Sequence, residues 1–347
     1  MMRVCILAAL LTYGAALGAL AQDVVVGVRS DARPFVFHDG EKFAGFLFEL
    51  CEAAINNAGL TPKWEPIDAG ERLSGIAING NLDMLCDPFT VTIERAGNML
   101  LSQILFISGG GYISAPKRID ALGIIAHDLN KKRRAAGQPV LDYQNRPVGS
   151  NGPTAARQLR VVSCDKLSDA HITTVRIGIL KGSTATHIVD NAMALPENDS
   201  EEIRRKPYET VCYEEFDTHG DGMARFCDPS QDDADPYPLS YYFGDRDILV
   251  ALLLDQKGCD HAQLGPSLFS LEPYAIAFSK RLDTETIVGI QRGFLRALTE
   301  EVSYKDSSGQ TQIAPRVIAL FISYFEGKVM SPSLRSLYST LLATERK

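Results

Sequence analysis

The chain has 347 residues and a net charge of −8, and 45% of its residues are hydrophobic while 22% are charged. At roughly 150 residues per domain, this length predicts about two domains, each large enough to bury a core. The composition is that of a folded globular protein and excludes both a disordered chain and a membrane bundle. Because acidic residues outnumber basic ones, we expect no nucleic acid partner, whose phosphates would need neutralising.

The first 21 residues have the layout of a secretory signal peptide. Arg3 precedes an apolar run from Val4 to Leu11, and Ala19-Leu20-Ala21 forms an A-x-A cleavage site. The alternative is a retained N-terminal anchor, since no charge interrupts the chain between Val4 and the cleavage site. We expect cleavage, so that 1–21 is a signal peptide and the mature protein is periplasmic.

Cleavage removes Cys5 and leaves an even number of cysteines in an oxidising compartment, which predicts disulfides. The sequence does not select one set of pairs. We expect Cys212 with Cys227 first, because they bracket a short polar loop, and Cys51 with Cys86 second, because both lie in the N-terminal part. No cysteine or histidine spacing is typical of a metal site, so we expect neither a metal nor another cofactor.

Strands and helices alternate along the first part of the mature chain. A β-branched run at 24–29 predicts a strand, and apolar residues at helical spacing predict a helix over 45–59. The pattern continues with a strand at 63–66, a helix at 73–79 and a buried strand at 82–86. This β-α-β-α-β order implies a parallel sheet covered by helices.

A second α/β unit is predicted further along the chain. It has a strand at 175–180, a Gly-Ser-Thr turn at 182–184 and a helix at 185–194. Helical spacing of apolar residues returns near the C-terminus at 284–302, 317–325 and 332–343. We expect these last helices to cover one lobe.

The polar loop predicted after strand 82–86 is the strongest candidate for a ligand site. In open α/β sheets, ligands bind beyond the carboxyl ends of the strands. Thr90 offers a hydroxyl there, and Arg95 offers a planar guanidinium that can hold a carboxylate through two parallel hydrogen bonds. Spacing alone favours the alternative, a surface arginine paired with Glu94.

Four segments resemble the family 3 periplasmic solute-binding proteins, which deliver polar amino acids to ABC transporters. They are PFTVTIER at 88–95, GFLFELCEAAINNAG at 45–59, RIGILKGST at 176–184 and EPYAIAFSK at 272–280. The first also resembles the corresponding loop in the ligand-binding cores of ionotropic glutamate receptors. The resemblance implies an α/β fold of the periplasmic binding protein type II class, with two α/β lobes joined by two crossover strands.

The resemblance also implies roles for five residues. Arg95 would bind the carboxylate of an amino acid, with Thr90 beside it, and the Pro88 carbonyl would accept a hydrogen bond from the ligand ammonium. Ser183 and Thr184 would complete the carboxylate site from the second lobe.

The acid for the ligand ammonium is expected at the end of a later strand. YYFGDRDIL at 241–249 resembles the family segment in which an Asp follows an aromatic-small pair, and this makes Asp245 the candidate. Asp247 is one alternative, and a purely structural Asp245–Arg246 pair is the other.

Two positions depart from the family pattern. Leu47 stands where many members have an acid, and Ala32 stands where an aromatic side chain often stacks on the ligand. Phe35 or Phe37 could supply that aromatic lid, although an aromatic before a helix is more often a core residue.

The resemblance divides the chain into 22–110 and 275–347 as lobe 1, and 111–274 as lobe 2 with insertions near 117–174 and 195–236. A ligand that touches both lobes would favour closure about the crossover strands. We therefore expect a monomeric, non-enzymatic binding protein that captures an amino acid or similar small zwitterion and delivers it to ABC transporter membrane subunits. The alternatives are a dehydratase-like periplasmic enzyme, which would need a general acid over its substrate, and a sensory ligand-binding component.

Overall fold

The computed structural model of the chain describes residues 23–78, 80–115, 137, 156–157, 162–166, 175–186, 189, 195–196, 211–228, 239–256, 258–266, 268–306, 308–325 and 328–344. The predicted signal peptide lies outside the described residues, as do large parts of the two predicted insertions.

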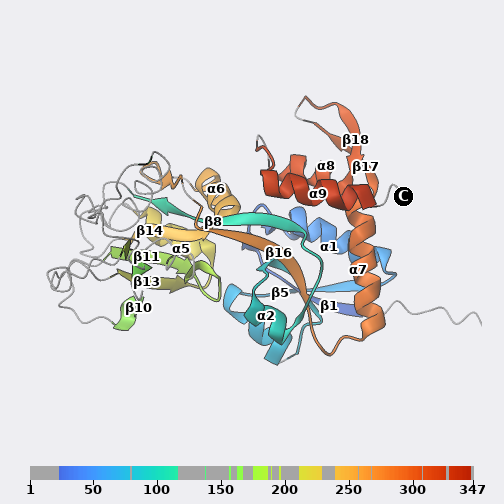
Figure 1. Ribbon diagram of the computed structural model, residues 1–347, viewed down its shortest axis with the longest axis horizontal. Coiled ribbons are helices and arrows are strands. Elements are labelled where there is room, and N and C mark those ends of the chain that lie inside the picture. The colour runs from blue at the N-terminus through green and yellow to red at the C-terminus, as the bar shows by residue number, and fades with distance from the viewer. Residues whose placement is uncertain are drawn as a thin grey trace, which may run out of the picture.

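Eleven strands of the described residues form one sheet that runs through both halves of the molecule (Figure 1). In spatial order, its main path consists of β10 (Val162–Ser163), β13 (Val211–Phe216), β11 (Val175–Leu180), β14 (Leu239–Asp245), β8 (Phe106–Ser114), β16 (Ser270–Phe278), β6 (Met84–Thr90), β1 (Asp23–Val28) and β5 (Thr61–Pro66). Two short strands pair beside this path, β15 (Gln263–Leu264) with β8 and β7 (Leu100–Leu101) with β16. We call the half with β1, β5 and β6 lobe 1, and the half with β10, β11, β13 and β14 lobe 2.

Two long strands, β8 and β16, connect the lobes. β8 pairs with β14 over Gly110–Ser114 and with β16 over Phe106–Gly110. β16 continues into lobe 1, where Tyr274–Phe278 pairs with β6. On the main path, the remaining neighbouring strands run parallel: β1 with β5 and β6 in lobe 1, and β13 with β10 and β11, and β11 with β14, in lobe 2. This topology confirms the predicted fold class of two α/β lobes joined by two crossover strands.

Helices pack on both lobes (Figure 1). Lobe 1 carries α1 (Phe46–Asn57), α7 (Thr284–Thr299), α8 (Arg316–Tyr324) and α9 (Pro332–Thr344), and lobe 2 carries α5 (His219–Cys227) and α6 (Arg246–Asp255). Shorter helical segments are Ala69–Glu71, Ser74–Ile78, α2 (Ile93–Asn98) and Cys164–Lys166. Outside the main sheet lie a three-stranded sheet of β2 (Asp31–Ala32), β3 (Val36–Asp39) and β4 (Lys42–Ala44), a hairpin of β17 (Glu301–Lys305) and β18 (Thr311–Pro315), and the pair β9 (Ala156–Arg157) and β12 (Leu195–Pro196). No helix among these is long and apolar enough to cross a membrane.

The predicted helix over 45–59 is confirmed as α1, which packs against α7. Its start requires glycine, since Gly45 has φ 126° and an added Cβ would lie 2.3 Å from the Phe35 carbonyl oxygen. The predicted C-terminal helices are confirmed as α7, α8 and α9, although α7 ends at Thr299 and the chain then enters β17. The predicted helix at 185–194 lies partly outside the described residues.

The strand predicted at 82–86 extends further than expected. β6 continues to Thr90, so Pro88 and Thr90 lie at the end of a buried strand and not in a loop. The pairing with β16 jumps from Phe89 to Leu85, which leaves the proline outside the ladder. Because proline has no N–H to donate, this interruption allows it inside a central strand.

Three disulfides connect the described cysteines. The predicted pair Cys51–Cys86 is confirmed, and it joins α1 to β6. The predicted pair Cys212–Cys227 is wrong. Cys212 lies in β13, which runs beside β10, and therefore reaches the cysteine just after β10; Cys227 ends α5 beside the segment that follows α6. The observed pairs are Cys164–Cys212 and Cys227–Cys259.

Candidate functional site

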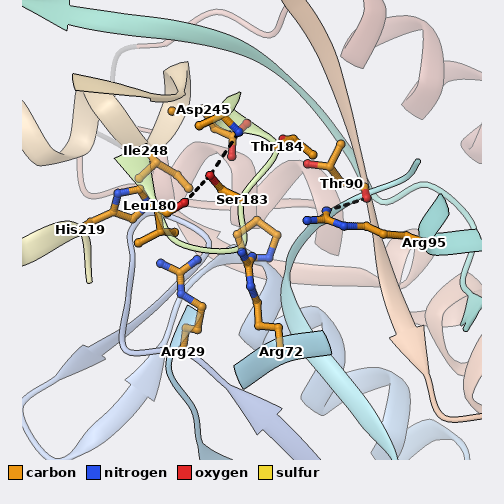
Figure 2. A pocket seen from close by; sticks show the side chains of 13 residues that line it. Arg29, Arg72, Thr90, Arg95, Leu180, Ser183, Thr184, His219, Asp245 and Ile248 are labelled. Carbon is orange, nitrogen blue, oxygen red and sulfur yellow. Dashed lines mark hydrogen bonds between the residues drawn. The ribbon is translucent and has the colours of Figure 1, made fainter. Parts of the chain in front are cut away.

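A cavity lies between the lobes, at the carboxyl ends of β6, β11 and β14 (Figure 2). This is the edge of an α/β sheet at which ligands bind. Six of the seven predicted site residues line it, namely Pro88, Thr90, Arg95, Ser183, Thr184 and Asp245. The other lining residues are Arg29, Arg72, Leu180, Ala185, His219, Gly244 and Ile248.

Arg95 enters the cavity from the first turn of α2. The Thr92 side chain accepts a hydrogen bond from the Arg95 N–H at 3.1 Å and so begins this helix. The guanidinium donates from Nη1 to the Thr90 carbonyl at 2.9 Å and from Nη2 to the Gly182 carbonyl at 3.1 Å. It also lies over the Phe89 ring, with 4.1 Å between Cζ and the ring centroid.

Arg95 is a buried cation without an ion pair among the described residues. Its exposed fraction is 7%, and the expected alternative pair with Glu94 does not form. Burial, followed by the neighbouring Arg72 guanidinium, lowers the pKa of Arg95 to about 10. Arg95 therefore remains charged at neutral pH but lacks a compensating anion in contact, which is the state of a site that can take a carboxylate.

Asp245 lies on another wall of the cavity, at the end of β14. Its Oδ1 is buried and has no hydrogen-bond partner among the described residues. Burial, followed by the nearby Glu272 carboxylate, raises the pKa of Asp245 to about 7. A ligand ammonium would favour the charged form of this carboxyl group.

Both alternatives to Asp245 have other partners. Asp247 lies 3.3 Å from Lys328 Nζ and accepts a hydrogen bond from Ser108 at 2.8 Å. Arg246 donates to the Gly265 carbonyl at 2.7 Å. Of the acids in this segment, the one that lines the cavity is therefore Asp245.

Ser183 and Thr184 form the turn that follows β11. The Ser183 hydroxyl donates to the Leu180 carbonyl at 2.6 Å and accepts from the Ala185 N–H at 3.2 Å, which fixes the turn. The Thr184 hydroxyl donates to Glu272 Oε2 at 3.1 Å. This contact ties lobe 2 to the crossover strand β16.

Sequence reasoning missed Arg29, Arg72 and His219. Arg29 follows β1 directly, so a basic residue at the carboxyl end of a predicted strand was a signal that could have identified it. His219 begins α5, and burial together with Arg29 lowers the pKa of its imidazole to about 3, so that it is neutral. Its Nδ1 lies 3.0 Å from the Tyr242 hydroxyl.

Phe35 is not a lid over the cavity. It is fully buried in the core of lobe 1, where its ring centroid lies 4.8 Å from that of Phe106 and 5.1 Å from that of Tyr274. The edge-to-face geometry of these contacts is typical of an aromatic core. Phe37, the other candidate, packs beneath the Arg33 guanidinium at 3.8 Å.

Metal ligation finds no support in the described residues, which contain no group of three or more His, Cys, Asp or Glu side chains placed to hold an ion. The cavity wall instead combines guanidinium, hydroxyl and carboxyl groups. Such a set binds small charged molecules through hydrogen bonds and ion pairs.

Comparison with known proteins shows a family and a fold for the chain. Residues 24–206 match the family described as bacterial extracellular solute-binding proteins, family 3. No curated protein matches the chain.

Three solved structures show the same fold at low sequence identity. An ancestral arginine-binding protein bound to arginine is 16% identical, with a TM-score of 0.55, over 87% of this chain and 98% of that one. A mutant of ArgBP from T. maritima is 16% identical, with a TM-score of 0.54, over 87% and 95%. The ancestral amino acid-binding protein AncCDT-1, a precursor of cyclohexadienyl dehydratase, is 14% identical, with a TM-score of 0.54, over 88% and 96%.

Proposed function

The chain belongs to family 3 of the bacterial extracellular solute-binding proteins, and we propose that it binds an amino acid between its lobes and delivers it to an ABC transporter. In this proposal, a cleaved signal peptide exports the protein to the periplasm. Closure of the lobes about β8 and β16 retains the ligand and creates the form that the transporter's membrane subunits recognise.

One observation carries the proposal: among the described residues, the buried Arg95 guanidinium forms no ion pair, and the buried Asp245 carboxyl group across the cavity has an oxygen, Oδ1, without a hydrogen-bond partner. An amino acid presents a carboxylate and an ammonium a few ångströms apart, and so supplies a partner for each group. A molecule that lacks either charge would leave one protein group buried and unpaired, which costs several kcal/mol.

The remaining predicted residues fit around this pair. The Thr90 backbone lies beside the Arg95 guanidinium, and Pro88 lies where the pairing of β6 with β16 is interrupted. Ser183 and Thr184 approach from lobe 2. We propose that Thr90, Ser183 and Thr184 contact the ligand carboxylate and that Pro88 accepts from the ammonium.

Contacts between the lobes already bring both walls together in this structure. Arg72 and Arg95 of lobe 1 donate to the same Gly182 carbonyl of lobe 2, at 3.0 and 3.1 Å. The His219 N–H of lobe 2 donates to Asp31 of lobe 1 at 2.6 Å. The described arrangement is therefore a closed one, and a ligand would contact both lobes at once.

Calorimetric titration of the mature protein with each standard amino acid tests this proposal. At least one should bind, and Arg95→Gln and Asp245→Asn should each weaken that binding by about a hundredfold, because each removes a buried charged partner. Arg292→Gln on the exposed face of α7 and Asp260→Asn at an exposed position are the matched controls and should bind as the unmodified protein does. If binding is unchanged in Arg95→Gln and Asp245→Asn, the proposed site is wrong.

One observation favours a second candidate, an enzyme on the same fold. A buried carboxyl group with a pKa of about 7, such as that of Asp245, can serve as a general acid near neutral pH. Proton NMR of the bound amino acid over hours decides between the two functions. An unchanged ligand supports binding alone, and a new product that disappears in Asp245→Asn supports catalysis.

A further inference from the structure

Two arginines beside Arg95 line the same cavity. Arg29 follows β1 and Arg72 follows the segment Ala69–Glu71, and both side chains are almost fully buried. Figure 2 shows their guanidinium groups directed from lobe 1 toward the cavity that Arg95 enters from the side, with Asp245 on the opposite wall. Guanidinium groups therefore face the cavity from lobe 1, and the Asp245 carboxyl group lies across from them.

Ion pairs hold these two guanidinium groups without using all of their donors. Arg29 donates from Nε and Nη2 to Asp31 Oδ1 at 2.9 and 2.6 Å, whereas its Nη1 lies 3.7 Å from Asp87 Oδ1, too far for a hydrogen bond. Arg72 donates from Nη1 to Asp87 Oδ2 at 2.8 Å and from Nη2 to the Gly182 carbonyl at 3.0 Å. Since each terminal nitrogen carries two hydrogens, both arginines keep N–H groups that no described acceptor takes.

The unused donors restrict the ligand side chain. Arg29 and Arg72 are already paired with Asp31 and Asp87, so the ligand side chain is selected by the N–H groups that remain. An ammonium or guanidinium group would bring only further donors to these donors and would accept from none of them. A neutral side-chain amide would offer one acceptor oxygen, but its own N–H groups would face the N–H groups of Arg29 and Arg72. A carboxylate offers acceptors only, and its two oxygens match the planar forks of two guanidinium groups.

We propose that the ligand is an acidic amino acid, whose side-chain carboxylate is bound by Arg29 and Arg72 while its α-carboxylate and ammonium face Arg95 and Asp245. This inference rests on the proposed function, because it assumes that an amino acid occupies the cavity. Asp31 and Asp87 then act as positioning residues, since they hold Arg29 and Arg72 in place. The cavity would select differently from a site for arginine on the same fold.

Competition between acids and their amides tests the inference. Isothermal titration of the mature protein with L-glutamate, L-aspartate, L-glutamine, L-asparagine and L-arginine should show one acid bound at least about tenfold more tightly than its amide, with L-arginine weaker still. Arg29→Gln and Arg72→Gln should reduce the acid-to-amide ratio to about one. Arg292→Gln is the matched control and should keep the original ratio.

Each outcome separates the two claims. If an amide or L-arginine binds as tightly as the acids, the inference is wrong while the proposed function stands. If none of the standard amino acids binds, both are wrong. Should Arg29→Gln fail to fold, Arg72→Gln and the acid-to-amide ratio of the unmodified protein decide the same question.

Discussion

Binding of an amino acid should release a proton from Asp245 near neutral pH. In the ligand-free protein, burial and the Glu272 carboxylate raise the pKa of Asp245 to about 7, so the group is largely protonated below that pH. A ligand ammonium beside it favours the charged carboxylate. We therefore expect affinity to rise with pH until Asp245 is ionised in the free protein.

The structure gives the size of the effect. If the ionised form alone binds the ammonium, affinity falls by about tenfold for each pH unit well below 7, and by roughly 30-fold between pH 8 and pH 5.5. Arg95 and His219, which also line the cavity, keep their protonation states in this range, because the pKa of Arg95 is about 10 and that of His219 is about 3. The carboxylate and ammonium of the free amino acid also keep their charges.

The Asp245 carboxyl group should also make the stability of the ligand-free protein depend on pH. Whereas affinity rises with pH, stability should fall. Because its folded-state pKa, about 7, lies above the ordinary value of 3.8, the folded protein holds a proton that the unfolded chain has lost. The free energy of unfolding of the ligand-free protein should thus fall as pH rises from about 4 to 7, by on the order of 4 kcal/mol from this group. Asp245→Asn should remove this dependence.

Calorimetry at pH 5.5, 6.5 and 8.0, each in two buffers with different ionisation enthalpies, measures both affinity and the protons released. We expect close to one proton released at pH 5.5 and almost none at pH 8.0. Asp245→Asn should show weak binding with no proton release at any of these pH values. Equal affinity at pH 5.5 and 8.0 in the unmodified protein would refute the reasoning.

Two further predictions concern stability. Peptide mapping without reduction should recover the three disulfides of the structure, and replacing both Cys51 and Cys86 by serine should lower the free energy of unfolding by about 3 kcal/mol. Gly293→Ala in α7 should destabilise the protein by about 2 kcal/mol, because its Cβ would lie 2.1 Å from the Ala54 carbonyl oxygen of α1, whereas Gly289→Ala in the same helix has its nearest neighbour at 3.8 Å and should be neutral or slightly stabilising. Urea denaturation compares the two alanine variants, and equal stabilities would contradict the packing argument.

Local sequence patterns predicted most of the described elements. The apolar periodicity of α1 and the β-branched run of β1 depend on neighbours within the same segment, and both appear at nearly their predicted bounds. The end of β6 could not be predicted in this way. Its last residues look like a loop by composition, but Phe89 and Thr90 pair with Ala275 and Tyr274 of β16, far along the chain.

Some residues of the candidate site could likewise be predicted from local sequence, and others could not. Arg95 and Asp245 stand in motifs that can be recognised from a few consecutive residues, and the structure brings both to one cavity. Arg72 has no such motif, because its contact with Asp87 arises from the folding of lobe 1 and its contact with the Gly182 carbonyl exists only where the lobes meet. The cysteine pairs were equally beyond local patterns, since parallel strands bring Cys164 and Cys212 together.

A crystal structure of the mature protein grown with L-glutamate tests the central claim most directly. We predict an amino acid between the lobes, with its α-carboxylate about 2.9 Å from the Arg95 guanidinium and its ammonium at a similar distance from the Asp245 carboxylate. An amino acid bound elsewhere, or bound in this cavity with neither group in contact with it, would contradict the account.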